Sequence, residues 1–409
     1  MPTVRAMSGR VVDRSPVAGT SPPSGVSLLI VATVASVIRE FLVPYAAHFR
    51  ALGWRVDAAA NGATADPVLR DAFDRVHEIP LSRSLLDLNG LARGARSLAA
   101  ILDTGPTIVH AHTPIAAFVA RVVVRRVPIE RRPALAYTAH GFHFHEGGNP
   151  ATNALFLTAE RVAGRWTDRL VVINGEDFAA ARLHRIVSPG RLVQMPGIGI
   201  DTQAWSPASV APEEAARVRE RLGIAVDTPV FVVVAEFSRN KRQRDVITAL
   251  ASMRHADAHL VLLGEGPERP SMESAVADLG LRDRVHFLGY VREVRPVVRA
   301  ATALVLPSKR EGLPRSVMEA LALEVPVIAS TARGNRELIG TDSGILVPTG
   351  DVRGLAEAMD RLIDHPDEGG AMGRRGRARM VEQYDLKVLI GMHEALYRGM
   401  LTERSGRAS

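Results

Sequence analysis

The sequence predicts an α/β protein in which two doubly wound parallel sheets follow one another along the chain. Short, continuously apolar runs alternate with segments of helical periodicity, a pattern typical of parallel strands that are covered by helices on both faces. The length of 409 residues is sufficient for two such domains. A stretch rich in proline and glycine, residues 195–212, separates the two alternating series and suits a domain linker.

The expected elements follow that alternation in order. The first series predicts strands at 27–33, 56–60, 108–112, 135–138, 169–173 and 192–195, with helices at 39–52 and 88–102. The second predicts strands at 230–235, 259–263, 285–288, 303–306, 325–329 and 344–347, with helices at 242–253, 270–279, 291–300 and 315–323. The segment 367–401 is also expected to be helical. Because doubly wound sheets bind ligands at the carboxyl ends of their strands, we expect a site in a cleft between two facing domains.

The expected domain organisation has four parts. Residues 1–25 are rich in Pro, Ser and Gly and lack an apolar core, so they are interpreted as a disordered extension and not as a signal peptide. Residues 26–205 form the first Rossmann-like domain and residues 206–385 form the second. Residues 386–409 are expected to form a helix that packs back on the first domain.

Composition narrows the classes of function. The absence of cysteine excludes disulfides, thiolate catalysis and Cys-ligated zinc, and it fits a reducing cytoplasm. The formal net charge of +7 favours anionic partners such as a membrane leaflet or a lipid-linked substrate. We expect no nucleic-acid partner, because 5% of the residues are aromatic and no recognition motif is present. The apolar run 27–38 is too short to cross a bilayer, which favours a cytoplasmic location, peripheral to the membrane at most.

Two carboxylates eight positions apart, Glu311 and Glu319, are the strongest functional signal. Gly312, Leu313 and Pro314 follow the first of them and predict a loop that enters a helix, since proline is favoured in a first helical turn. The free amides of such a turn can bind an anion, and carboxylates can accept hydrogen bonds from sugar hydroxyls. This layout suits a nucleotide sugar. The ordinary alternative is a pair of surface glutamates beside a helix start.

Two further residues are candidates for the same chemistry. Lys241 follows the strand expected at 230–235, where a cation can stabilise the negative charge that develops on a leaving diphosphate. The alternative for Lys241 is a solvated lysine in the basic run 239–244. His140 follows the strand expected at 135–138, where a polar cap is the ordinary role for a histidine.

Other histidines suggest weaker hypotheses. His110 and His112 on the strand expected at 108–112 are predicted to face opposite sides, one in the core and His112, with Thr113, toward an acceptor. A metal site is the alternative use of a different group, which consists of His140, His143, His145 and Glu146. Close spacing on a loop does not by itself make ligands converge, so we expect no metal.

The segment 264–267, Gly-Glu-Gly-Pro, follows an expected strand and precedes an expected helix. It lacks the third glycine of the dinucleotide fingerprint, because Arg269 stands in that position. A tight turn near the nucleotide or its phosphates is the favoured interpretation. A dehydrogenase is therefore not expected.

Taken together, the motifs resemble the retaining glycosyltransferases of family 4, which have the GT-B fold. The resemblance covers nearly everything after residue 25 and depends on the order and spacing of its parts. Those parts are 109–114, 137–144, 196–201, 240–241, 264–267, 285–289 and 308–328. The version Thr-Ala-His-Gly-Phe-His-Phe at 138–144 resembles the branch that builds bacterial capsule, exopolysaccharide or lipid-linked oligosaccharide.

The resemblance implies roles for individual residues. Glu311 would contact the donor sugar, Glu319 would bind the ribose diol, Lys241 would hold the diphosphate, and His140 would lie beside the reacting carbon. The turn that touches phosphate or sugar would consist of Gly312, Leu313, Pro314 and Arg315. Relatives usually carry an arginine five residues before the lysine. Here Glu236 takes its place, and Arg239 is the expected substitute.

The resemblance further implies transfer of a sugar from a nucleotide donor, UDP-linked for preference, to a saccharide or polyprenyl-diphosphate-linked acceptor. It implies neither a bound metal nor another cofactor. Two alternatives stay open: a GT-B epimerase that acts on the sugar nucleotide without a second sugar, and a non-catalytic protein that binds a nucleotide sugar. The apolar, basic stretch 114–126, with Arg131 and Arg132 after it, is either an ordinary core helix or a membrane-surface contact.

Overall fold

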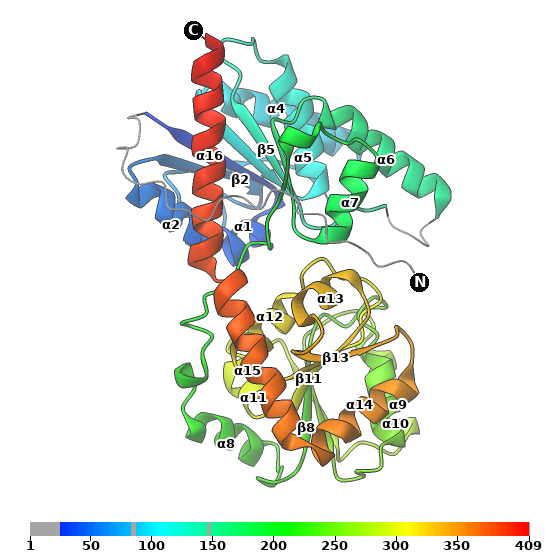
Figure 1. Cartoon of the computed structure of the whole chain (residues 1–409). Coiled ribbons are helices and arrows are strands. Elements are labelled where there is room, and N and C mark those ends of the chain that lie inside the picture. Colours follow the sequence, from blue (N-terminus) through cyan, green and yellow to red (C-terminus); the bar gives the residue numbers. More distant parts are fainter. Residues whose placement is uncertain (1–24, 83–86, 145–148, 409) are drawn as a thin grey trace, which may run out of the picture. The chain divides into compact units, whose positions relative to one another are not determined.

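The structure is a computed structural model that describes residues 25–82, 87–144 and 149–408. The expected disordered extension therefore lies, except for Gly25, outside the described residues. The chain divides into two compact units. Figure 1 shows the chain coloured from its N-terminus to its C-terminus. Unit 1 contains residues 1–198 and 388–409, and unit 2 contains residues 199–387. Each unit is described by itself.

Unit 1 contains a seven-stranded sheet in which all paired strands are parallel, in the order β3-β2-β1-β4-β5-β6-β7. β4 is buried along its whole length and β1 is buried up to Thr33, which explains why both sequences are mostly apolar. The strands are β1 (Ser27–Val34), β2 (Arg55–Asn61), β3 (Arg75–Glu78), β4 (Ile108–His112), β5 (Ala134–Ala139), β6 (Arg169–Val172) and β7 (Leu192–Gln194).

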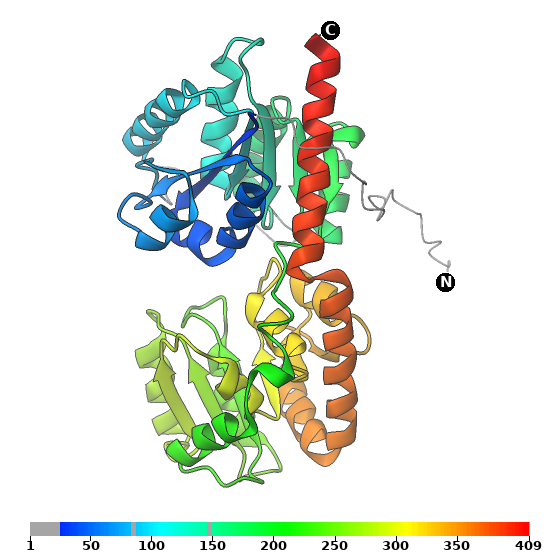
Figure 2. The same cartoon turned by 90° about the vertical axis from the view of Figure 1, so that its left-hand side faces the viewer.

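Helices cover both faces of this sheet. The core formed with α4, α5 and α7 includes the odd-numbered positions of β1 and β4, such as Leu29 and Val109, whereas α16 lies along the opposite face (Figures 1 and 2). The α-helices are α1 (Ala35–Phe41), α2 (Val43–Ala51), α3 (Pro67–Ala72), α4 (Leu88–Leu102), α5 (Pro114–Arg126), α6 (Pro150–Gly164), α7 (Gly175–Leu183) and α16 (Leu386–Ala408). A short 3-10 helix, η1 (Pro189–Arg191), precedes β7.

Unit 2 contains a six-stranded parallel sheet in the order β10-β9-β8-β11-β12-β13. Its strands are β8 (Val230–Val234), β9 (His259–Leu263), β10 (Val285–Gly289), β11 (Ala303–Leu306), β12 (Val327–Ser330) and β13 (Gly344–Val347). Its helices are η2 (Pro207–Ser209), α8 (Pro212–Arg221), α9 (Gln243–Ser252), α10 (Arg269–Asp278), α11 (Arg295–Arg299), α12 (Arg315–Ala322), α13 (Arg333–Ile339), α14 (Val352–Asp364) and α15 (Pro366–Gln383).

Two separate apolar cores lie on the two faces of the unit 2 sheet. Side chains of α9, α10 and α14 pack against Phe231 and Val233 on one face, and side chains of α12 and α13 pack against Val230 and Val232 on the other. Successive residues of β8 therefore enter opposite cores, as the alternation of side chains along a strand requires. Because helices cover both faces of the sheet, the sequence of β8 is apolar without interruption.

The structure corrects the expected elements at several places. The helix expected at 39–52 is two helices that meet at Leu42, because Pro44 has no backbone N–H with which to continue the first one. The segment 75–78 was not expected to be a strand. It forms the edge strand β3, whose side chains are only partly buried and whose sequence is mostly polar. The expected helix at 291–300 is reduced to α11, which starts beside Pro296.

Helix α16 is anchored at its start and packs with unit 1 over most of its length. Leu386 donates its backbone N–H to the carbonyl of Ile200, and Ile200 donates to the carbonyl of Tyr384. Further along, the ring of Tyr397 lies 5.1 Å from that of Phe49 on α2. No helix among the described residues combines the length and the apolar composition that a membrane span requires.

Candidate functional site

The two halves of the unit 2 sheet meet between β8 and β11, where the strand order reverses. Ligands of doubly wound sheets bind in the crevice at such a switch point, outside the carboxyl ends of the strands. The loop that contains Lys241 follows β8, and the loop that contains Glu311 follows β11. The sheet therefore brings two segments that lie 70 positions apart in the sequence to one location.

Lys241 and Glu311 form an ion pair at this location. The Nζ of Lys241 lies 2.6 Å from Oε1 of Glu311, and the two side chains are 22% and 9% exposed. The loops are also joined through Asn240, whose carbonyl accepts from the N–H of Lys309 at 2.8 Å and whose Nδ2 donates to the carbonyl of Arg310 at 3.0 Å. The ammonium and the carboxylate are thus held in place by the backbone on both sides.

The turn after Glu311 leads directly into α12. Pro314 is the N-cap residue of this helix, one position before the first helical turn in which it was expected. Glu319 is the fifth residue of α12, and its side chain is 10% exposed. Its Oε1 accepts a hydrogen bond from Nε of Arg315 at 2.7 Å. The second carboxylate is thereby oriented by an arginine of the preceding turn. Gly312 and Leu313 are half-buried, and Arg315 is exposed.

The start of α13, the helix that follows β12, lies against the same turn. A Cβ added to Gly334 would lie 1.8 Å from the carbonyl oxygen of Gly312, so only glycine permits this approach. Beside it, Nε of Arg333 donates to the carbonyl of Glu311 at 3.3 Å. The sequence interpretation did not include Arg333, because its position becomes informative only once β12 is known to lie beside β11.

Glu236, which stands where relatives carry an arginine, is exposed just after β8. The expected substitute, Arg239, has a side chain that is 92% exposed, and its Nε lies 3.3 Å from Oε1 of Glu268. Glu268 is the N-cap residue of α10. In this structure the side chain of Arg239 is thus directed toward α10.

The Gly-Glu-Gly-Pro segment forms a turn that fits tightly against the loop after β8. Gly264 has a φ of +137°, and a Cβ there would lie 2.1 Å from the carbonyl oxygen of Ala235. Gly266 has a φ of +156°, and a Cβ there would lie 2.3 Å from the carbonyl oxygen of Phe237. Both positions require glycine because of conformation and space together. The turn supports the loop that contains Lys241.

In unit 1, the prediction that His110 and His112 face opposite sides is wrong. Residues two positions apart on a strand share a face, and the two imidazole rings stack with centroids 4.2 Å apart. Both histidines are buried. On the same face, His110 contacts the hydroxyls of Tyr397 at 2.5 Å and Thr138 at 2.8 Å. Tyr397 was not identified from the sequence because it lies on the distant helix α16.

The row of contacting imidazole rings that begins with His110 and His112 continues to His140. Nδ1 of His112 lies 3.2 Å from Nε2 of His140, which is the half-buried end of the row. Burial lowers the pKa of His140 to about 4, and the neighbouring His393 acts in the same direction. Burial also lowers the pKa of His112 well below its ordinary value. At neutral pH His140 is therefore an uncharged imidazole that can exchange hydrogen bonds but carries no positive charge.

Thr113 occupies the switch point of the unit 1 sheet, between β1 and β4. Its φ is +70°, a conformation that is strained for a β-branched residue. Its hydroxyl accepts from the N–H of Thr33 at 3.1 Å and lies 2.7 Å from the hydroxyl of Thr33. The end of β1 is thereby joined to the loop after β4, and the strain marks Thr113 as a functional candidate.

The alternative metal site consists of four residues, of which the structure describes only His140 and His143. His145 and Glu146 lie outside the described residues. His143 is exposed, and its ring lies 5.0 Å from that of Phe156. Among the residues that the structure describes, no group of three or more His, Asp or Glu side chains is arranged to hold a metal ion.

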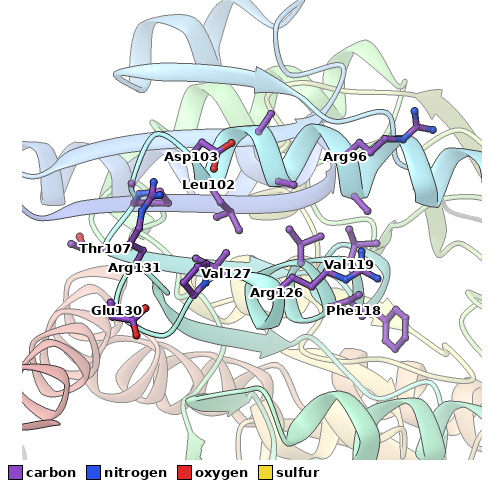
Figure 3. Close-up of a pocket in the computed structure, with 18 of the residues that line it drawn as sticks. Arg96, Leu102, Asp103, Thr107, Phe118, Val119, Arg126, Val127, Glu130 and Arg131 are labelled. Atoms are coloured by element: carbon purple, nitrogen blue, oxygen red, sulfur yellow. The ribbon is translucent and has the colours of Figure 1, made fainter. Parts of the chain in front are cut away.

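The stretch 114–126 is the helix α5, and its apolar side is mostly packed against the sheet. Some of its residues also line a groove of about 1060 Å³ between α4 and α5 (Figure 3). The groove has an apolar floor that includes Phe118 and Val119, and a basic rim. The charged residues that line it are Arg96, Asp103, Arg126, Glu130, Arg131 and Arg404.

Comparisons with known proteins agree with this architecture. Residues 214–379 match the family model described as glycosyl transferases group 1, and residues 41–203 match the model of Glycosyltransferase Family 4. The chain is 35% identical over 355 residues to the putative glycosyltransferase EpsD of Bacillus subtilis (strain 168), a match that covers 86% of this chain and 91% of that protein. It is 23% identical over 303 residues to the UDP-Gal:alpha-D-GlcNAc-diphosphoundecaprenol alpha-1,3-galactosyltransferase of Escherichia coli, covering 73% and 76%.

Solved structures show the same fold. HepE of Anabaena, in complex with UDP and glucose, superposes with a TM-score of 0.75 at 18% identity, covering 91% of this chain and 99% of that one. The sucrose-phosphate synthase of Thermosynechococcus elongatus has a TM-score of 0.78 at 21% identity, covering 92% and 100%. The chain therefore belongs to glycosyltransferase family 4, and its two doubly wound units are those of the GT-B fold.

Proposed function

We propose that this protein is a retaining glycosyltransferase that moves a sugar from a UDP-linked donor to a saccharide or polyprenyl-diphosphate-linked acceptor during synthesis of a cell-surface polysaccharide. The observation that carries the proposal is the ion pair of Lys241 and Glu311 at the switch point of unit 2. A cation and an acidic group placed together there suit the diphosphate and the hydroxyls of a nucleotide sugar.

The proposed chemistry makes a specific demand on Lys241. The bond between the anomeric carbon and the diphosphate oxygen breaks, the acceptor oxygen bonds to that carbon on the same face, and the acceptor proton passes to the departing diphosphate. Negative charge develops on the diphosphate, and a preorganised ammonium group stabilises that charge in the transition state. No protein nucleophile is assigned.

The remaining site residues would bind and orient the substrates. Glu311 would accept hydrogen bonds from the donor sugar, and Glu319, which Arg315 holds in position, would accept from the ribose. Amides of the turn after Glu311 would contact phosphate or sugar. His140, an uncharged imidazole, would bond a sugar hydroxyl. The proposal includes no metal and no other cofactor.

Names of relatives support the substrate classes. HepE was solved with UDP and glucose, and the name of the Escherichia coli relative specifies a UDP-linked donor and a diphosphoundecaprenol acceptor. We extend both classes to this chain. A lipid-linked acceptor would place the protein at the cytoplasmic face of the cell membrane, where a nucleotide sugar and a polyprenyl diphosphate are both within reach.

The test combines ligand binding with turnover. Purified full-length protein is screened for thermal stabilisation by UDP-, GDP- and ADP-sugars, because a bound donor raises the melting temperature. The selected donor is then incubated with and without acceptor. Transfer that requires acceptor, with the anomeric configuration retained by NMR, supports the proposal. Release of an epimer without acceptor would establish the epimerase instead, and tight binding without any product would establish a non-catalytic binding protein.

We also propose that the groove between α4 and α5 contacts the anionic membrane surface. An apolar floor bordered by arginines complements a lipid with an acyl chain and an anionic headgroup. Arg126 and Arg131 border the groove on α5 and on the loop after it, and both are exposed. Near an anionic surface each arginine contributes about 1 kcal/mol to binding.

The expected result is that the protein binds anionic vesicles more tightly than neutral ones. The double variant Arg126→Gln/Arg131→Gln should lose about thirtyfold in affinity for anionic vesicles, which corresponds to two arginines at about 1 kcal/mol each. The matched control is Arg93→Gln/Arg161→Gln, which removes two exposed arginines of unit 1 that do not line the groove. Flotation that is equal on neutral and anionic vesicles, or equal losses in both double variants, would refute the membrane contact.

A further inference from the structure

We propose that Arg333 is the second cation of the donor site and binds the diphosphate of the nucleotide sugar. This inference rests on the proposed function and names a residue that takes over the charge missing at Glu236. It is carried by the position of Arg333, the first residue of α13, next to the turn that Glu311 begins.

Three neighbouring strands deliver the charged groups of this site. Lys241 follows β8, Glu311 follows β11 and Arg333 follows β12, and the three strands are adjacent in the sheet. Arg333 donates from Nε to the carbonyl of Glu311 at 3.3 Å, while the carboxylate of the same residue accepts from Lys241 at 2.6 Å. Both cations are therefore bound to one residue, on its backbone and on its side chain.

The position of Arg333 is held by its surroundings. The backbone of Gly334, the next residue, fits against the carbonyl of Gly312 so closely that no side chain can intervene. Beyond it, Nδ2 of the buried Asn335 donates to the carbonyl of Ser330 at 3.0 Å, and the hydroxyl of Ser330 donates to the carbonyl of Ser308 at 2.5 Å. These bonds join the end of β12 to the loop after β11 and to α13, and so hold the start of α13 beside the site.

The balance of charge explains why a second cation is needed. Lys241 is paired with Glu311, so together the two side chains contribute no net charge where a diphosphate would bind. Glu236 adds a negative charge near the end of β8, and Arg239 is directed to Glu268. Arg333 adds a positive charge that offsets the negative charge of Glu236. Its planar guanidinium can also donate two parallel hydrogen bonds to phosphate oxygens, a geometry that lysine does not offer.

The experiment separates a phosphate contact from other roles. Binding of UDP, or of the nucleoside diphosphate that the donor screen selects, is measured by calorimetry on the wild type and on Arg333→Gln. Binding of the free nucleoside is measured by ligand-observed NMR. The matched control is Arg336→Gln, which removes an exposed arginine three positions further along the same helix. Circular dichroism and melting temperature establish that each variant is folded.

We expect Arg333→Gln to weaken diphosphate binding by at least about tenfold, to reduce its dependence on salt, and to leave nucleoside binding unchanged, whereas Arg336→Gln changes none of these. A charge relocation completes the test: Glu236→Arg, added to Arg333→Gln, should recover most of the lost affinity. Arg333→Lys should recover only part of it, because the bidentate geometry is lost.

Several outcomes would overturn the inference. Unchanged diphosphate affinity in folded Arg333→Gln would exclude the contact, and an equal loss for nucleoside and diphosphate would assign the residue a structural role. A loss seen only with the complete sugar nucleotide would move Arg333 to the sugar. If wild-type protein binds no nucleotide at all, the proposed function fails, and that failure is distinct from the other three results.

Discussion

Replacement of Lys241 by alanine is expected to lower turnover by at least about a hundredfold while the protein stays folded. Loss of one preorganised group that stabilises developing charge typically costs two to three orders of magnitude in rate, or about 3 kcal/mol in the barrier. The ammonium of Lys241 lies 2.6 Å from Glu311 and is 22% exposed, so it can turn from that carboxylate to a bound diphosphate. Steady-state kinetics with the identified donor and acceptor measure the effect.

The control for this variant is Lys309→Ala. Lys309 is exposed on the loop that also contains Glu311, and its side chain has no role in the proposed chemistry. Its turnover should stay within about twofold of the wild type, since surface substitutions of this kind are usually close to neutral. Near-normal turnover of Lys241→Ala would contradict the role assigned to Lys241. A large fall in melting temperature would instead indicate that the ion pair supports the fold.

The second large expected effect is on stability. The substitution Arg121→Met should lower the free energy of unfolding by about 3–5 kcal/mol. Arg121 on α5 is 1% exposed, its Nη1 lies 2.8 Å from Oε2 of Glu160, and its guanidinium lies over the ring of Tyr137. Removing the cation leaves the carboxylate of Glu160 in the interior without a countercharge. Urea unfolding of the full-length protein measures the loss.

Two further variants test the cause of that loss. Arg121→Met/Glu160→Met removes both charges and should recover most of the stability, because an apolar pair of similar volume replaces a buried ion pair at little cost. Arg161→Met removes the exposed arginine next to Glu160 and should change stability by less than about 0.5 kcal/mol. If Arg121→Met alone costs less than about 1 kcal/mol, the buried pair does not stabilise unit 1 as described.

Buried regular elements were predicted well, and exposed or interrupted ones were not. The strands at 108–112 and 259–263 coincide with β4 and β9, because a parallel strand covered on both faces is mostly apolar; in these two strands the polar residues are His110, His112 and His259. The edge strand β3 has a mostly polar sequence, so no apolar run marked it. The helix break at Leu42 depends on Pro44, whose missing N–H has an effect that periodicity alone does not express.

The residues of the candidate site also fall into some that the sequence predicted and some that it did not. The motif from Glu311 to Glu319 and the lysine at 241 could be identified from residue type and local spacing. The prediction for His110 and His112 was wrong because residues two positions apart on a strand share a face, which the sequence itself implies. Their contacts with His140 and Tyr397 could not be predicted, because one of these residues follows β5 and the other lies on α16, and they meet β4 only after the sheet and the last helix have assembled. Arg333 could not be chosen among many arginines until β12 was placed beside β11.

By itself, then, the sequence determined the alternation of strands and helices, the family and the turn that leads into α12. The alternation and the turn are recorded in residues that are near one another along the chain, whereas the family is recorded in the order and spacing of motifs from residue 109 to residue 328. Only the tertiary structure decided that Lys241 pairs with Glu311 across 70 positions, that Arg333 borders the same turn, and that His112 supports His140. The reason is physical: local patterns follow backbone geometry, whereas these contacts depend on the order in which distant strands join a sheet.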